Sequence, residues 1–152
     1  MSIETSYNFR RVSDTVTTSG IVAVDDLASL KAAGCEVVVN LLPDSSEHAV
    51  EGEADIVASQ GIGYVHIPVD FGAPTPAQFE EFAAVIDAQA DRVIHVHCAA
   101  NYRVSVFYAL YAVHRGLWSI EEADEHIQSI WTPDPAWQDF IASERARSGS
   151  SA

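Results

Sequence analysis

The sequence predicts one α/β domain of three layers, with a central, mainly parallel sheet flanked by helices. Short apolar runs of strand length alternate along the chain with amphipathic stretches of helical period, which is the pattern of parallel strands joined by helices. The chain has 152 residues, of which 48% are hydrophobic, enough for one sizeable core. We therefore expect residues 1–147 to form the domain and the Ser-rich residues 148–152 to be a disordered tail.

The first third of the chain predicts a sheet edge, a helix and a buried strand. Residues 7–12 and 15–18 are short runs typical of edge strands. Residues 24–33 space their apolar side chains as a helix does, and Gly34 marks the end of that helix. Residues 36–42 are mostly apolar, which is typical of a strand that is buried on both faces.

The remaining elements continue the same alternation. A turn over residues 43–46 can cap a helix expected over residues 47–60, and the alternating residues 62–69 predict the third main strand. The elements after it are a helix over 78–90, a strand over 92–97, and helices over 104–115, 119–131 and 134–147. Thr75 is the expected N-cap of the helix over 78–90, and Ser119 is the expected N-cap of the helix over 119–131.

Charge and hydropathy exclude several classes of partner. The chain has 22 acidic and 8 basic residues, and the resulting net charge of −14 opposes binding to nucleic acid phosphates or anionic lipid. No apolar run approaches the ~20 residues of a membrane-spanning helix, and the first residues lack the features of a signal peptide. We expect a cytoplasmic protein that binds neither nucleic acid nor membrane. Two cysteines, Cys35 and Cys98, are too few for a disulfide scaffold.

The most informative segment runs from an apolar strand into a short loop between Cys98 and Arg103 and then into a helix. A thiol at the N-terminus of a helix has a lowered pKa, and the N–H groups of such a loop can bind an oxyanion. The segment therefore predicts a cysteine nucleophile in an anion-binding loop. The expected phosphate-binding residues are Ala99, Ala100, Asn101, Tyr102 and Arg103.

Each neighbouring candidate has a structural alternative. The planar fork of Arg103 can hold two oxygens of an anion, although a surface salt bridge would also explain an arginine there. We expect His97 to hydrogen-bond the loop backbone or to help hold the thiolate, the alternative being a packed strand residue. Asp70 follows a strand at the same sheet edge, so it is a candidate general acid and equally a simple turn aspartate.

These residues carry a resemblance to a known family. The chain resembles the cysteine-based dual-specificity and tyrosine phosphatase superfamily through His97-Cys98-x4-Arg103 and through the segment 68–75 around Asp70. It is more closely similar to the small bacterial phosphatase-like domains related to those of β-lactamase-hydrolase-like proteins. The resemblance implies a phosphatase-like fold and hydrolysis of a phosphate monoester through a phosphocysteine, with Cys98, Arg103 and Asp70 as the catalytic residues.

Two departures from the commonest phosphatase pattern keep other functions open. The loop is one residue shorter than Cys-x5-Arg, a length also seen in rhodanese-type sulfurtransferases, and Val104 stands where the superfamily usually has Ser or Thr. Ser105, one position later, is a supporting candidate. The alternatives are a sulfurtransferase that forms a persulfide on Cys98, or a noncatalytic phosphate-binding domain. No Cys, His and Asp spacing suggests a metal, so we expect no cofactor and a phosphorylated substrate or oxyanion as the ligand.

Overall fold

The computed structural model describes residues 3–150 and has a five-stranded sheet at its centre. The strands are β1 (Arg10–Arg11), β2 (Val16–Ser19), β3 (Val37–Asn40), β4 (Gly63–His66) and β5 (Ile94–His97). Their order in the sheet is β1-β2-β5-β3-β4, and only the edge strand β1 is antiparallel. The other four strands therefore end at one edge of the sheet, where ligands bind in open α/β folds.

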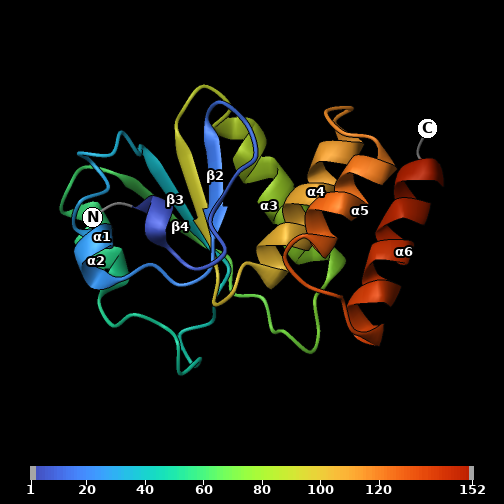
Figure 1. Ribbon diagram of the computed structural model, residues 1–152, viewed down its shortest axis with the longest axis horizontal. Coiled ribbons are helices and arrows are strands. Elements are labelled where there is room, and N and C mark those ends of the chain that lie inside the picture. Colours follow the sequence, from blue (N-terminus) through green and yellow to red (C-terminus); the bar gives the residue numbers. More distant parts are fainter. Residues whose placement is uncertain (1–2, 151–152) are drawn as a thin grey trace.

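Helices cover both faces of this sheet, as Figure 1 shows. The helices are α1 (Val24–Leu27), α2 (Glu53–Ala58), α3 (Pro76–Ala88), α4 (Tyr102–His114), α5 (Ile120–Gln128) and α6 (Pro135–Ser150), after a short 3-10 turn η1 (Ile3–Thr5). On one side lie α1 and α2, and on the other lie α3 to α6 (Figure 1). The predicted three-layer α/β domain is confirmed.

The two layers of helices enclose two separate hydrophobic cores. The larger core joins the sheet to α3, α4, α5 and α6, and Trp137 and Phe107 are fully buried in it. The middle of α4, from Val104 to Ala112, is buried, because this helix lies between the sheet and the two C-terminal helices. The smaller core lies under α1 and α2, around Leu27, Val38 and Val57. No helix between residues 3 and 150 combines the length and hydrophobicity needed to cross a membrane.

The face of the sheet under α2 is polar at its carboxyl edge. Ser19, His97, Asn40 and His66 are register partners across β2, β5, β3 and β4. Parallel strands covered on both faces are ordinarily apolar throughout. A row of polar side chains at the ends of four such strands therefore departs from the core pattern, and departures of this kind occur mainly at functional sites.

Several expected boundaries differ from the observed ones. The helix expected over residues 24–33 is regular only from Val24 to Leu27, and the one expected over 47–60 begins at Glu53. Gly52 explains the late start, because its positive φ of 78° interrupts a right-handed helix. The tail was expected to be disordered from residue 148, but α6 continues to Ser150. An established helix gains one hydrogen bond for each residue added, so weak formers can extend it; residues 151–152 lie outside the described part.

Candidate active site

Cys98 follows β5 directly, and the loop it begins leads into α4 at Tyr102. Its backbone N–H donates to Ser19 O over 3.3 Å, which ties the start of the loop to β2. The Cys98 side chain is fully buried and belongs to the larger core. The strand-to-helix turn predicted from the sequence is therefore present, with the sulfur beneath the surface rather than on it.

The loop is held in shape by Asn101 and by a residue that the sequence did not point to, Asn8. Asn101 has a left-handed backbone, with φ 70° and ψ 7°, as its residue type permits. Its side-chain amide donates to Asn8 O over 2.8 Å and to Thr18 Oγ1 over 3.1 Å. In return the Asn8 amide donates to Ala100 O over 3.0 Å. The N-terminal segment around Asn8, which lies outside the Cys98–Arg103 motif, thus holds the loop in place through hydrogen bonds.

Arg103 lies against an aromatic ring instead of an acidic partner. Its guanidinium carbon is 5.1 Å from the centroid of the Phe71 ring, a cation–π contact. None of the ion pairs among the described residues involves Arg103, so the surface salt bridge considered above is absent from this part of the chain. Its Nε is buried and has no hydrogen-bond partner among the described residues. The side chain therefore retains a donor for a ligand.

Asp70 lies in the loop between β4 and α3, next to Phe71. The Asp70 side chain is exposed, and its Oδ1 accepts the Gly72 N–H over 2.8 Å, as a turn aspartate does. The loop is anchored from α6, because Trp137 Nε1 donates to Phe71 O over 2.7 Å. Through Phe71, the loop that carries Asp70 thus meets the arginine of the Cys98 loop.

Ser105 is buried and both of its hydrogen-bonding roles are occupied. Its hydroxyl donates to Tyr102 O over 2.7 Å and accepts Nε1–H of Trp131 over 3.0 Å. Tyr102 itself stacks on Trp131, with ring centroids 4.6 Å apart and an interplanar angle of 3°. Trp131 therefore joins the segment after α5 to the first turns of α4.

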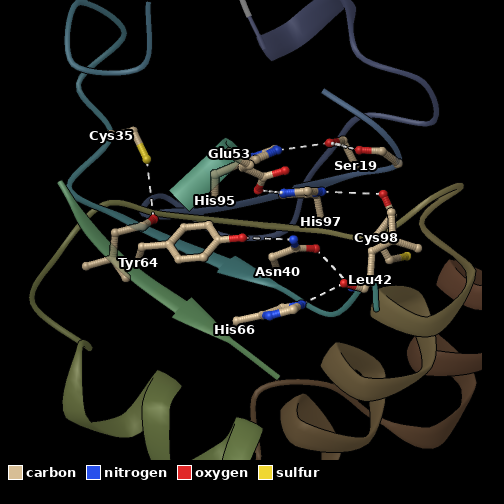
Figure 2. A network of polar contacts seen from close by, with 12 residues as sticks. Ser19, Cys35, Asn40, Leu42, Glu53, Tyr64, His66, His95, His97 and Cys98 are labelled. Carbon is tan, nitrogen blue, oxygen red and sulfur yellow. Dashed lines mark hydrogen bonds and ion pairs between the residues drawn. The ribbon is translucent and has the colours of Figure 1, made fainter. Parts of the chain in front are cut away.

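His97 is bonded on both sides of its ring, as Figure 2 shows. Its Nδ1 lies 3.4 Å from Cys98 O, so the expected contact with the loop backbone is present. Its Nε2 lies 2.5 Å from Oε2 of Glu53, and both side chains are buried. Glu53 was not a sequence candidate, although a signal existed: it lies four residues before the buried Val57 and so shares the inward face of α2.

His95 lies on the same face as His97, 6.3 Å away between ring centroids, as strand alternation predicts. Its two nitrogens meet the hydroxyls of Thr17 and Ser19 at 2.8 and 2.9 Å. Burial, together with the charge of His97, lowers the pKa of His95 to about 3. His95 is therefore a neutral structural residue at physiological pH.

The second cysteine is a core residue. Cys35 is buried, donates its S–H to Val37 O over 3.3 Å, and has its pKa raised by burial to about 11. It therefore stays a thiol under conditions in which a reactive cysteine ionises. Across residues 3–150, no three His, Cys, Asp or Glu side chains come together as metal ligands would.

Comparison with known families gives a match over most of the chain. The family model described as "Beta-lactamase hydrolase-like protein, phosphatase-like domain" matches residues 8–114, which include Asp70, Cys98 and Arg103. No curated protein matches the sequence.

Solved structures are similar over nearly the whole chain. A candidate phosphatase (DUF442) from Shewanella putrefaciens CN-32 is 31% identical, with a TM-score of 0.86 and 95% of each chain covered. The core catalytic domain of the PP-IP phosphatase SIW14 from S. cerevisiae, in complex with citrate, has 14% identity and a TM-score of 0.74, covering 90% of this chain and 85% of its own. A variant of P. aeruginosa TpbA in complex with pTyr has 17% identity and a TM-score of 0.65, covering 91% and 81%. The last two likenesses concern the fold alone.

Proposed function

The chain belongs to the phosphatase-like domain family of beta-lactamase hydrolase-like proteins, and from this premise we propose that it hydrolyses phosphate monoesters through a phosphocysteine on Cys98. The amides of the loop from Ala99 to Arg103 and the Arg103 guanidinium bind the phosphoryl oxygens. Asp70 is the general acid. The substrate is a phosphorylated molecule, and other tetrahedral oxyanions bind as competitors.

The first chemical step transfers the phosphoryl group to sulfur. The Cys98 thiolate attacks phosphorus, the S–P bond forms, and the bond from phosphorus to the ester oxygen breaks. The departing alkoxide or phenoxide takes the proton of the Asp70 carboxyl group and leaves as an alcohol or phenol. Arg103 and the loop amides offset the negative charge that the equatorial oxygens carry in the transition state.

The second step releases phosphate. Asp70, now a carboxylate, takes a proton from water, the water oxygen attacks phosphorus, and the P–S bond breaks to regenerate the thiolate. The hydroxyl proton of Ser105 is already donated to Tyr102 O, and Val104 offers no hydroxyl. Neither residue donates a hydrogen bond to the departing thiolate, so we expect this step to be the slower one.

One observation supports the proposal above the others, namely the contact between Phe71 and Arg103. The general-acid candidate is adjacent to Phe71 in sequence, and the Phe71 ring lies under the guanidinium at 5.1 Å. Two loops from different strands therefore meet at the arginine, whose Nε has no partner among the described residues. A site for an anion between a nucleophile and an acid needs this convergence.

The burial of Cys98 sets a condition on the reaction. Its side chain has 0% exposure, so the sulfur reacts only when substrate binding moves the side chains above it. A noncatalytic anion-binding domain would have the same buried sulfur but no turnover. The two functions differ in one measurable quantity, the release of phosphate.

Hydrolysis of an aryl phosphate, with vanadate as competitor, tests the proposal. We expect no turnover by Cys98→Ser and a loss of about 10²- to 10⁴-fold in kcat for Asp70→Asn, the usual worth of a general acid. Cys35→Ser and Asp44→Asn are matched controls, because Cys35 is the other free buried cysteine and Asp44 is another exposed turn aspartate. Both controls should keep wild-type activity.

Other outcomes of these experiments would indicate one of the two alternative functions. Anion binding without any phosphate release by the wild type would identify the noncatalytic domain. The comparisons do not favour a sulfurtransferase, and a mass measurement after incubation with thiosulfate tests it: one added sulfur on Cys98, with Asp70→Asn unaffected, would contradict the phosphatase mechanism.

A further inference from the structure

The polar face under α2 extends from a cleft lined by Glu53 and Tyr64 to the back of the Cys98 loop. Figure 2 shows the Glu53 carboxylate beside the His97 ring, and the ring beside Cys98. Glu53 is 5% exposed and His97 is 1% exposed. A charged pair so deeply buried is costly unless its geometry is good and its remaining atoms are bonded. Stability alone therefore does not explain why Glu53 and His97 are buried together.

The hydrogen-bond partners of the His97 ring determine its protons. Nδ1 faces the carbonyl oxygen of Cys98 at 3.4 Å, and a carbonyl oxygen can only accept. Nε2 faces a carboxylate oxygen of Glu53 at 2.5 Å, which also accepts when the carboxylate is ionised. A ring with a proton on each nitrogen can donate to both acceptors, whereas a neutral ring can donate to only one.

Glu53 has a second polar neighbour besides His97, the Tyr64 hydroxyl. The Tyr64 hydroxyl accepts from the Asn40 amide over 3.0 Å and also interacts with the Glu53 carboxylate. Burial raises the pKa of Tyr64 to about 12, and the negative charge of Glu53 adds to the rise, so Tyr64 keeps its proton and can donate it. Glu53 also borders a cleft of about 500 Å³, lined by Tyr64 and His66 among others.

We propose that Glu53 is a positioning residue that keeps His97 doubly protonated behind the loop and thereby supports the Cys98 thiolate. The inference deepens the proposed function and rests on it. The His97 ring lies between Glu53 and Cys98 and contacts the Cys98 carbonyl oxygen (Figure 2). The positive end of the pair is therefore nearer to Cys98 than the negative end is, and its field favours a negative sulfur. The titratable groups that face the ring are His95 from β5, Glu53 from α2 and, beyond Glu53, Tyr64 from β4. His95 is uncharged, as its lowered pKa requires.

The protonation of His97 can be measured directly by ¹⁵N NMR of the histidine ring nitrogens, with His97 assigned through its backbone. At a pH near 7.5 we expect two protonated nitrogens on His97 in the wild type. In Glu53→Gln we expect a neutral ring, since a buried imidazolium without an anionic partner loses its proton. Glu144→Gln is the matched control, because Glu144 is also a buried carboxylate in an ion pair, with Arg147, but lies on α6. A wild-type ring with one proton would overturn the proposal, even if the variant failed to fold.

The consequence for sulfur is measured by the ultraviolet absorbance of the thiolate, with Cys98→Ser as the blank. Across a pH series, Glu53→Gln should require a higher pH than the wild type to form the thiolate, whereas Glu144→Gln should form it as the wild type does. Cys35 does not interfere, since its pKa is about 11. Equal thiolate fractions in Glu53→Gln and the wild type would overturn the proposal. Both readouts use the free protein, so an absence of phosphatase turnover would count against the proposed function and not against this pair.

Discussion

In the proposed mechanism, anion binding depends on Arg103. We expect the planar shape of its guanidinium to matter as much as its positive charge. Arg103→Lys keeps the positive charge but removes the planar fork, so affinity for vanadate or phosphate should fall about tenfold or more. The increase in melting temperature that these anions produce measures this affinity.

Arg115→Lys is the control for this substitution. The Arg115 guanidinium lies over Tyr111 at 5.1 Å, as Arg103 lies over Phe71, but it is also paired with Asp87 at 2.6 Å and sits at the far end of α4. Both variants weaken a cation–π contact, and only Arg103→Lys should lose the response to anions. Equal responses in the two variants would remove Arg103 from the anion site.

The element on which the site depends is the loop itself, and Gly20 is where its packing is tightest. A Cβ at Gly20 would lie 2.5 Å from Ala99 O and 2.7 Å from Ala100 Cα, both backbone atoms that cannot rotate away. Gly20→Ala should therefore displace the loop, lowering the free energy of unfolding by about 2–3 kcal/mol and abolishing anion binding. Urea unfolding and the thermal response to vanadate check the two effects.

Gly63→Ala provides the comparison within the same sheet. A Cβ at Gly63 would come within 3.6 Å of a Val37 methyl group, an ordinary contact distance. This variant should bind anions as the wild type does and lose little stability. If Gly20→Ala were as mild as Gly63→Ala, the close approach of β2 to the loop would not be what shapes the site.

The sequence predicted the elements better than their ends, for a physical reason. The spacing of Leu27 and Leu30 correctly predicts two buried side chains, but tight turns with bonds three residues apart satisfy that spacing as well as a regular helix does. The strand-to-helix turn at Cys98 was predictable because the apolar run, the turn and the helix are each visible in a short stretch of neighbouring residues. Contacts across the sequence were not: Asn8 meets the loop from 92 residues away, and Glu53 reaches His97 from 44 residues away.

At the scale of the whole molecule, two electrostatic effects oppose each other as pH falls. With a net charge of −14, the folded chain repels itself, and acid relieves that repulsion. Against this, burial lowers the pKa of His95 to about 3, and burial with the charge of Arg10 lowers that of His126 to about 4. Between pH ~6.5 and these values the unfolded chain binds protons that the folded chain does not.

Stability should consequently fall with acidification over this range, because each buried histidine contributes up to about 1.4 kcal/mol per pH unit while many carboxylates remain ionised. Urea unfolding at a series of pH values measures the slope. His126→Phe should flatten it, since the ring contact with Trp118 at 5.0 Å is retained and the titrating nitrogen is gone. His48→Gln, at an exposed position, should leave the slope unchanged. Stability that rises steadily from neutral pH down to pH ~4 would mean that the relief of charge repulsion exceeds the cost of burying neutral histidines.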